Sequence, residues 1–300
     1  MLKNIWHYNK NLFFILIFLF NISLFDFIAL HADDLPCNGY PELCSKRYDE
    51  VAYPTTHNAF DYAYGPEFWF PPNQQFPITR QLEDGVRGLM IDIYEFNGIR
   101  PWLKDEIYVC HGYCSLGGEP LVDVLGYVKE FLDNNPREVV TLIFECYVDH
   151  EPVVDAFDES GLISYVHSQT EGEMWPTLAE MIQNNKRLVV FTDKDGGSPD
   201  WYHDVWEFAV ETHWDNKERS DLTCDFNRGD PDNDLFIINH FLTKPLARRT
   251  LSLQVNFNPF LINRLEECRD TTGKVPNFVT VDFYAFGDLF EAVNIINGVE

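Results

Sequence analysis

The amino-acid sequence predicts an α/β fold, a single TIM-type (β/α) barrel that is irregular or incomplete at one strand. Short runs rich in β-branched and aromatic residues alternate with amphipathic stretches, which is typical of parallel βα units. The length of 300 residues is compatible with one closed barrel. The interior of the chain contains no Ser/Gly linker, repeat or low-complexity segment that would mark a domain boundary.

Seven strand-like segments account for most of the predicted barrel. In chain order they are residues 51–56, 87–93, 107–111, 139–146, 188–192, 235–241 and 278–284. The polar stretch 193–234 carries few strand signals, so we expect an extended loop or a helical excursion above the barrel there. With this count, the eighth strand of the barrel is irregular or missing.

Three segments have a helical pattern. Residues 121–134 are amphipathic and end at an Asn-Asn-Pro sequence, residues 176–185 begin with a proline in the first turn, and residues 288–297 close the chain. Hydrophobic residues make up 45% of the chain, which is enough for a large core and excludes an intrinsically disordered protein.

The N-terminus has the layout of a secretory signal peptide. Two lysines precede an apolar run over residues 11–30, and small residues follow before an acidic pair. We therefore predict a signal peptide at residues 1–32, a barrel domain at residues 33–300 and a secreted protein. An apolar run of about 20 residues is also long enough to span a bilayer, so an uncleaved membrane anchor at residues 11–30 is the alternative.

Seven cysteines follow the apolar run, and in an oxidising compartment pairing is the default. The pairs that we predict are Cys37–Cys44, Cys110–Cys114 and Cys224–Cys268. This leaves Cys146, within an apolar strand, as a buried thiol. No Cys-x-x-Cys pair is present, so the cysteines do not predict a metal site.

The chain is strongly acidic, with a net charge of −26 from 48 acidic and 22 basic residues. Such a charge repels a phosphate backbone at long range, which excludes nucleic acid as a partner. An anionic substrate would need a local positive group or a metal ion in its binding site.

Polar side chains collect at the C-terminal ends of the predicted strands, where (β/α) barrels carry their chemistry. They are His57, Asn58, Asp92, His111, Glu145 and Asp282. Any one of them alone is compatible with a structural role, such as capping the next helix. Together they favour an active site. Because imidazole titrates near neutral pH, two histidines can act as base and acid, a pairing that suits cleavage of a phosphodiester.

Several segments resemble a known family. The segments that resemble the X-domain core of the phosphatidylinositol-specific phospholipase C superfamily are residues 53–60 (YPTTHNAF), 81–94 (QLEDGVRGLMIDIY) and 110–112 (CHG). The segments that resemble the secreted PLC-like phosphodiesterases of plants and fungi are residues 135–140, 175–178, 187–191 and 276–284. The resemblance extends over about residues 48–298 and implies the barrel fold and phosphodiesterase chemistry.

The resemblance implies a role for each residue at the strand ends. His57 is expected to be the general base and His111 the general acid, while Asp282 orients His57 through its far ring nitrogen. With phosphatidylinositol, His57 would deprotonate the inositol 2-hydroxyl, which attacks phosphorus and yields a cyclic phosphate and diacylglycerol. A substrate without a neighbouring hydroxyl would need water as the nucleophile.

The remaining strand-end residues are expected to assist. Asn58 matches a position that supports the second histidine or binds calcium in different members, and Asp92 is counted with the catalytic residues. Tyr94, Glu145 and Tyr284 are expected to contact the substrate.

Position 94 departs from the family pattern. Metal-independent bacterial members have an arginine there that stabilises the phosphorane and calcium-dependent members have a carboxylate, whereas this chain has Tyr94. One hypothesis is a Ca²⁺ or Mg²⁺ ion held by Asn58, Asp92 and Glu145, whose oxygens suit a hard cation. The alternative is that these residues only form hydrogen-bond networks without a metal. Arg87 is expected on the opposite strand face near the barrel bottom, with a structural role.

An aromatic segment directly follows the first histidine motif. Its members are Phe60, Tyr62, Tyr64, Phe68, Trp69 and Phe70. These side chains would form either an apolar rim that touches a membrane surface transiently or a local packing cluster.

The leading prediction is a secreted phosphoric diester hydrolase that cleaves a phospholipid of the phosphatidylinositol type, or a related small phosphodiester, by two-histidine acid–base catalysis. An enzymatic alternative is a metal-dependent glycerophosphodiesterase or an enzyme like sphingomyelinase D. A third hypothesis, from a different class, is a catalytically inactive barrel that serves as an extracellular binding protein.

Overall fold

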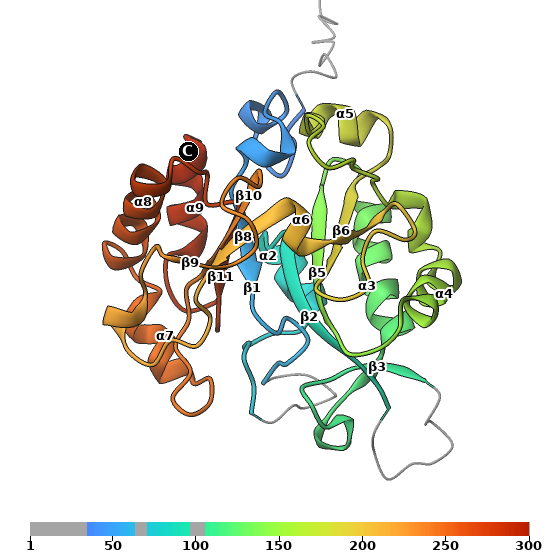
Figure 1. The fold of residues 1–300 in the computed structure, drawn as a ribbon, viewed down its shortest axis with the longest axis horizontal. Coiled ribbons are helices and arrows are strands. Elements are labelled where there is room, and N and C mark those ends of the chain that lie inside the picture. Colours follow the sequence, from blue (N-terminus) through green and yellow to red (C-terminus); the bar gives the residue numbers. More distant parts are fainter. Residues whose placement is uncertain (1–34, 64–70, 97–105, 300) are drawn as a thin grey trace, which may run out of the picture. The chain divides into compact units, whose positions relative to one another are not determined.

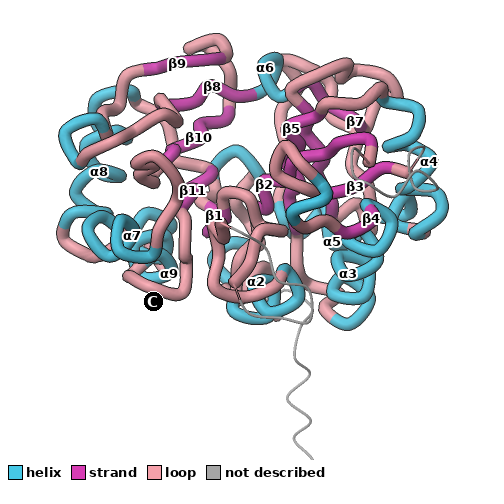
Figure 2. The backbone as a smooth tube through the Cα atoms, turned by 90° about the horizontal axis from the view of Figure 1, so that it is seen from below, coloured by secondary structure: helices cyan, strands magenta, loops and turns pink. Residues whose placement is uncertain are grey.

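Eight parallel strands form a curled sheet in this protein, whose computed structural model describes residues 35–63, 71–96 and 106–299. These strands are β1 (Tyr53–Thr56), β2 (Gly88–Glu95), β5 (Val140–Cys146), β6 (Leu188–Thr192), β7 (Tyr202–Asp204), β8 (Ala209–Thr212), β10 (Leu235–Asn239) and β11 (Phe278–Val281). Their order in the sheet is β7-β6-β5-β2-β1-β11-β10-β8. Within the unit Pro36–Glu300, helices lie outside the curled sheet (Figures 1 and 2).

The barrel is open between β7 and β8. In the described part of the chain these two strands do not pair with each other, and the short helix α6 (Val205–Phe208) connects them. The predicted fold, a (β/α) barrel that is irregular or incomplete, is therefore confirmed.

Two expectations about the strands are wrong. The segment at 107–111 is not a barrel strand, because β3 (Ile107–Val109) pairs antiparallel with the end of β2 and with β4 (Glu119–Pro120), as a hairpin that extends from the barrel. The stretch 193–234 is not merely a loop or a helical excursion, because it contains β7, β8 and the antiparallel strand β9 (Phe226–Arg228). A strand of three or four residues is too short for its alternation to stand out in the sequence.

Eight helices cover or connect the strands in the described ranges. They are α2 (Ile78–Asp84), α3 (Leu121–Asn134), α4 (His150–Ser160), α5 (Leu178–Gln183), α6 (Val205–Phe208), α7 (Arg249–Val255), α8 (Phe260–Thr272) and α9 (Leu289–Asn297). The short 3₁₀ segments are η2 (Pro41–Leu43), η3 (Tyr48–Glu50), η5 (Cys114–Leu116), η6 (Leu162–Tyr165) and η7 (Arg219–Asp221).

The three predicted helices are present as α3, α5 and α9. Residues 121–134 match α3, while α5 begins later than predicted because Thr177 caps it with a side chain that accepts from the Glu180 backbone. Asp288 is likewise the N-cap residue of α9 and not part of it. The sequence interpretation missed α2, α4, α7 and α8.

Strand alternation places one set of side chains inside the barrel. On β1, Tyr53 and Thr55 share a face with His57, which directly follows the strand, and on β2 Met90 shares a face with Asp92. The intervening residues, such as Leu89, pack outward among the apolar residues of the surrounding helices. Arg87 belongs to the outward set.

Aromatic side chains fill the lower part of the barrel. Tyr53 and Phe278 stack with ring centroids 5.7 Å apart, Phe191 lies edge-on to Phe278 at 6.3 Å, and Tyr48 stacks on Trp175 at 4.6 Å. All five residues are at most 2% exposed. Burial of each such ring contributes about 2–3 kcal/mol, and the packed layer forms a floor on which a cavity can rest.

The disulfides agree with the predicted pairing, and the structure leaves Cys146 as a buried free thiol.

The structural role expected for Arg87 also holds. Its Nε donates to Glu138 at 2.8 Å, its NH1 donates to the carbonyl oxygens of Leu82 and Val86, and its guanidinium lies over the ring of Phe131.

Some sequence predictions fall outside the described residues. These are the signal peptide at 1–32, the alternative anchor at 11–30, and the aromatic residues Tyr64, Phe68, Trp69 and Phe70. The two described members of that aromatic segment, Phe60 and Tyr62, are buried and belong to the core. Among the described helices, none has the length and apolar character to cross a membrane.

Candidate active site

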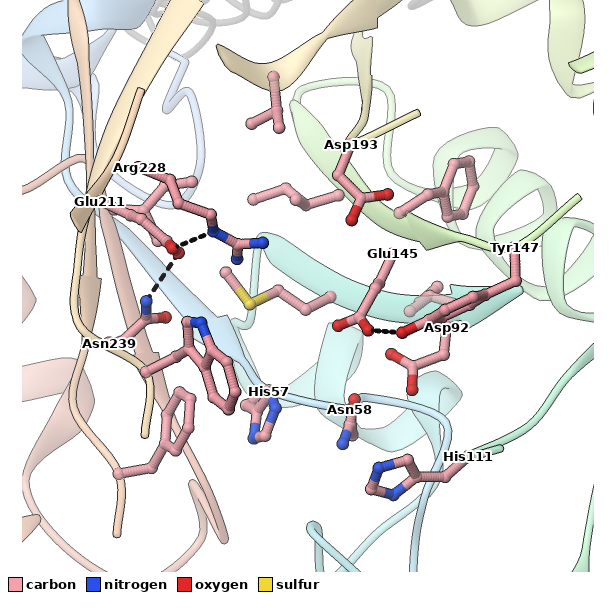
Figure 3. Close-up of a pocket in the computed structure, with 18 of the residues that line it drawn as sticks. His57, Asn58, Asp92, His111, Glu145, Tyr147, Asp193, Glu211, Arg228 and Asn239 are labelled. Atoms are coloured by element: carbon pink, nitrogen blue, oxygen red, sulfur yellow. Dashed lines mark hydrogen bonds and ion pairs between the residues drawn. The ribbon is translucent and has the colours of Figure 1, made fainter. Parts of the chain in front are cut away.

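A cavity of about 300 Å³ opens where the barrel strands end, above the aromatic floor. It brings together the predicted residues His57, Asn58, Asp92, Tyr94, His111 and Glu145. Asp282 lies directly behind His57. Figure 3 shows His57, Asn58 and His111 along one side, Asp92, Glu145 and Asp193 on a second, and Arg228 with Glu211 facing them.

His57 is fixed in orientation by its surroundings. Its Nδ1 lies 2.9 Å from Oδ1 of Asp282, which is 1% exposed, and its ring stacks on Phe241 with centroids 4.0 Å apart. Asn73 donates to the same Asp282 oxygen at 2.8 Å. Since the carboxylate holds Nδ1, Nε2 is the nitrogen left to exchange a proton with a ligand.

The residue after His57 makes the turn that leads away from β1. Asn58 has a φ of 45°, in the left-handed region that asparagine tolerates better than most residues, and its carbonyl accepts the Asp61 backbone N–H at 2.9 Å. The Asn58 side chain is buried, faces the cavity and has no hydrogen-bond partner among the described residues.

His111 reaches the same cavity from the hairpin, not from a barrel strand. It follows β3 inside the five-residue loop closed by Cys110–Cys114, and the Cys110 backbone N–H donates to the Asp92 carbonyl at 3.3 Å. Desolvation by the surrounding protein, together with the nearby charge of His57, lowers the pKa of His111. The negative charges of Glu145 and Asp282 oppose this shift.

Carboxylates form the second side of the cavity, which we call the acidic wall: Asp92, Glu145 and Asp193. Asp92 and Glu145 are register partners on β2 and β5. Burial, followed by the charges of Glu145, Asp61 and Asp193, raises the pKa of Asp92 well above its usual value. Burial likewise raises the pKa of Asp193, although the Cys146 backbone N–H donates to it at 2.8 Å.

The acidic wall offers a donor set that fits a hard cation. The Asn58 and Asp92 side chains are both buried and lack hydrogen-bonded partners among the described residues, and the Glu145 carboxylate accepts only the Tyr147 hydroxyl there. Two carboxylates and an amide oxygen are ligands of the kind that Ca²⁺ and Mg²⁺ prefer, with water completing the shell. In the described ranges no three His, Cys, Asp or Glu side chains form a metal cluster by themselves, so the Asn58 amide would be required.

Tyr94 occupies the cavity edge and supplies no positive charge. Its ring stacks on Tyr147 with centroids 4.2 Å apart and an interplanar angle of 10°. Burial raises its pKa to about 12, so the phenol stays neutral. This pair forms an aromatic face beside the acidic wall.

Tyr284, expected to contact substrate, does not line the cavity. It is 2% exposed, and its hydroxyl donates to Asp84 at 2.8 Å on the outer side of the barrel. The reason lies one residue earlier, because Phe283 has a φ of 49° and breaks the alternation that would have kept Tyr284 on the inner face.

Sequence reasoning missed the side of the cavity that faces the acidic wall. Arg228 on β9 donates from Nε to Glu211 Oε1 on β8 at 2.5 Å, and its guanidinium lies over Trp206, 4.4 Å from the ring centroid. Asn239 on β10 donates to the other oxygen of Glu211 at 2.9 Å. Glu211 and Arg228 are separated in a stretch without strand pattern, so no spacing in the sequence connects them.

The arrangement can therefore transfer protons and hold an anion. An imidazole oriented by a carboxylate and a second imidazole share one cavity, and the cavity also carries an oxygen-rich wall and a guanidinium. These are the groups needed to activate a hydroxyl, protonate a leaving oxygen and neutralise a phosphoryl charge.

Comparison with known proteins finds a matching family model and relatives that carry the same family description. A family model described as PI-PLC X 1 matches residues 43–297. A PI-PLC X domain-containing protein of Arabidopsis thaliana is 31% identical over 295 residues, which cover 87% of this chain and 63% of that protein. PI-PLC X domain-containing protein 1 of Arthroderma benhamiae is 30% identical, with 89% of this chain and 91% of that protein covered. The chain thus spans less than two thirds of the length of the plant relative.

A further relative and two solved structures extend this comparison. An uncharacterized secreted protein of Arthroderma benhamiae is 27% identical, with 85% of this chain and 61% of that protein covered. The phosphatidylinositol-specific phospholipase C of Listeria monocytogenes matches with a TM-score of 0.58 at 15% identity, covering 89% of this chain and 97% of that chain. A mutant of the Staphylococcus aureus enzyme matches with a TM-score of 0.56 at 12% identity, covering 86% and 94%. At these identities the structures show a shared fold.

Proposed function

Because this chain belongs to the PI-PLC X family, we propose that it is a phosphoric diester hydrolase of the phospholipase C type, acting outside the cell on a phospholipid or a related small phosphodiester. The observation that carries the proposal is the meeting of His57, bonded to Asp282, with His111 in one cavity. A purely structural role would not require two imidazoles at the same opening.

His57 acts as the general base. Asp282 accepts from Nδ1–H and thereby leaves the lone pair on Nε2 to take the proton of the attacking hydroxyl. The buried carboxylate also stabilises the imidazolium that forms. In a phosphatidylinositol substrate the nucleophile is the neighbouring inositol hydroxyl, and in a diester without such a group it is water.

His111 acts as the general acid. Its protonated ring donates to the leaving alkoxide, such as diacylglycerol, as the bond to phosphorus breaks. Because the pKa of His111 is lowered, its protonated ring gives up the proton easily, but only a small fraction of the rings is protonated at neutral pH. The negative charge of a bound substrate raises this fraction.

The acidic wall holds a divalent cation in this proposal. Asn58, Asp92 and Glu145 provide its oxygen ligands, and Asp193 lies on the same wall. A bound Ca²⁺ or Mg²⁺ would polarise the phosphoryl oxygens and stabilise the charge that develops on them. The same wall favours a second candidate, a metal-dependent glycerophosphodiesterase or an enzyme like sphingomyelinase D, with a different head group.

An extracellular location agrees with the three disulfides and with a relative that is described as secreted. Contact with a membrane surface is supported by the loop that carries His111. Tyr113 in this loop is 69% exposed and Leu116, two residues after the end of the loop, is 63% exposed, so two apolar side chains near His111 in the chain are available to enter a lipid interface.

Hydrolysis of a diester panel tests the proposal. The mature protein is incubated with phosphatidylinositol, lysophospholipids and glycerophosphodiesters in calcium, magnesium or excess chelator. We expect cleavage of a phosphatidylinositol-type lipid that disappears in His57→Ala. Full activity in chelator would contradict the cation, and preference for glycerophosphodiesters or a sphingolipid would favour the second candidate. Absence of any His57-dependent cleavage would reject the enzyme in favour of a binding protein.

A further inference from the structure

Arg228, whose side chain is 45% exposed, differs from the buried arginines Arg187 and Arg264 in how it uses its donors. Arg187 donates from Nε, NH1 and NH2 to protein acceptors, and Arg264 donates from NH1 and NH2 to Asn239, His240, Thr212 and Thr223. Arg228 donates only from Nε, to Glu211. Its NH1 and NH2 groups have no hydrogen-bonded acceptor among the described residues, and Figure 3 shows the guanidinium pointing into the cavity.

The position of this guanidinium is fixed before any ligand binds. Glu211, only 2% exposed, is itself held by Asn239 at 2.9 Å and by Asn227 at 3.2 Å. Trp206 supports the flat face of the guanidinium at 4.4 Å. Fixing the donors in advance lowers the entropic cost of binding and favours a charge that appears in the transition state.

The charge balance of the cavity calls for such a group. Among the described lining residues, Arg228 is the only lysine or arginine, whereas the opposite side is the acidic wall. An anionic substrate approaching a chain with a net charge of −26 needs this local positive charge.

We infer that the free NH1 and NH2 groups of Arg228, on β9, bind the non-bridging oxygens of the scissile phosphodiester. The geometry suits this ligand, because the two terminal nitrogens form a planar fork that matches a phosphate edge. The fork then faces the phosphoryl group from the side of the cavity opposite to the acidic wall. The assignment to the scissile group rests on the proposed function, whereas the binding of phosphate by Arg228 does not.

The first measurement is steady-state kinetics on a diester that contains a single phosphate. Arg228→Gln keeps hydrogen-bonding capacity but loses the charge and the fork, and we expect kcat/KM to fall by about 10²–10³, with much of the loss in kcat. Arg228→Lys restores the charge without the fork and recovers part of the loss. Arg219→Gln is the matched control, since Arg219 stacks on Phe260 at 3.9 Å and does not line the cavity.

The second measurement is calorimetric binding of inorganic phosphate to the wild type, Arg228→Gln, Arg219→Gln and His57→Ala. We expect binding to weaken at least about tenfold in Arg228→Gln only, as for loss of a charge-assisted hydrogen-bond pair. Unchanged phosphate affinity and kcat/KM in Arg228→Gln would overturn the inference. A loss confined to substrates with a second phosphate would overturn the assignment to the scissile group.

The two measurements separate this inference from the proposed function. If the wild type cleaves no diester but binds phosphate through Arg228, the proposed function fails and the anion-binding role stands. If the wild type cleaves diesters and Arg228→Gln behaves like Arg219→Gln, the proposed function stands and this inference fails.

Discussion

The two histidines and the arginine of the cavity are held by different kinds of structure. His57 and its partner Asp282 follow β1 and β11, which pair over four residues in the middle of the parallel sheet. Arg228 lies on β9, a three-residue strand at the sheet edge that pairs antiparallel with β8 through an irregular register at Glu211. His57 and Asp282 therefore rest on central strands of the barrel, whereas the hairpin carries His111 and the sheet edge carries Arg228.

This difference separates two tasks that an enzyme must perform. Proton transfer requires its heavy atoms at hydrogen-bond distance, so a small displacement of His57 is costly. Charge neutralisation decays more slowly with distance, and a side chain as long as arginine tolerates small shifts of its strand. A scaffold can therefore vary the sheet edge next to the opening between β7 and β8 while its central strands keep the position of His57.

Removal of either imidazole should have the largest effect. In His57→Ala and His111→Ala we expect kcat to fall by about 10²–10⁴, because each loses one proton transfer, and the double variant should lose little more than the worse single variant. His150→Ala, on α4 away from the cavity, is the control. Unchanged turnover in both single variants would contradict the proposed proton-transfer roles of His57 and His111.

The pH profile should show which imidazole limits the alkaline side. His111 must be protonated to act as the acid, and its pKa is lowered by desolvation and by His57. As pH rises through this lowered value the protonated fraction falls, so kcat/KM should decline with a midpoint below about 6.5 and then drop about tenfold per pH unit. Because the charge of Glu145 raises the pKa of His111, Glu145→Gln should move the midpoint to lower pH. A midpoint above that of free imidazole would contradict the acid role.

The same division between central strands and sheet edge explains how far the sequence could be interpreted. His57, Asp92 and Glu145 sit at or beside the ends of strands, and strand alternation places them inside the barrel. Asn58 reaches the cavity through the turn with positive φ that follows β1. Arg228 could not be found in this way, because its strand has three residues and its partner Glu211 is 17 positions away, a pairing set only by tertiary structure.

Two other outcomes have equally local causes. The sequence predicts a barrel strand before His111, but the structure has a hairpin there. A short apolar pattern is the same in both, so the sequence cannot distinguish them. His111 nevertheless lines the predicted cavity. Tyr284 was expected to contact substrate because it continues the alternation of β11. A single residue with positive φ, Phe283, redirects it, and no sequence pattern signals that turn.

The double variant Cys110→Ala with Cys114→Ala removes the disulfide that closes the loop around His111. We expect a moderate loss of both stability and turnover. The chain-entropy relation gives a loss of about 2 kcal/mol in stability for so short a loop, and the freed loop should lower kcat about tenfold by misplacing His111. The double variant Cys37→Ala with Cys44→Ala is the matched control, since that bridge closes a loop of similar length away from the cavity. Equal activities in the two double variants, at similar denaturation midpoints, would show that the disulfide does not position His111.

The smallest expected effect on activity comes from Asp61, behind His57, whose substitution should change stability and not turnover. Asp61 is 2% exposed, its Oδ1 has no hydrogen-bond partner among the described residues, and burial together with the charge of Asp282 raises its pKa to about 8. The folded protein keeps this proton between pH 4 and 8 while the unfolded chain releases it, so the group lowers stability progressively, by at most about 1.4 kcal/mol per pH unit, as pH rises through that window.

Asp61→Asn should therefore flatten the pH dependence of the free energy of unfolding, measured in urea at several pH values, and leave kcat/KM below pH 8 unchanged because the carboxyl is already neutral there. Asp155→Asn, on the exposed face of α4, should keep the wild-type slope. Identical slopes in the two variants would mean that Asp61 is ionised in the folded protein. The region behind His57 would then carry two buried negative charges, Asp61 and Asp282, and their burial would require a compensating cation on that side of the cavity.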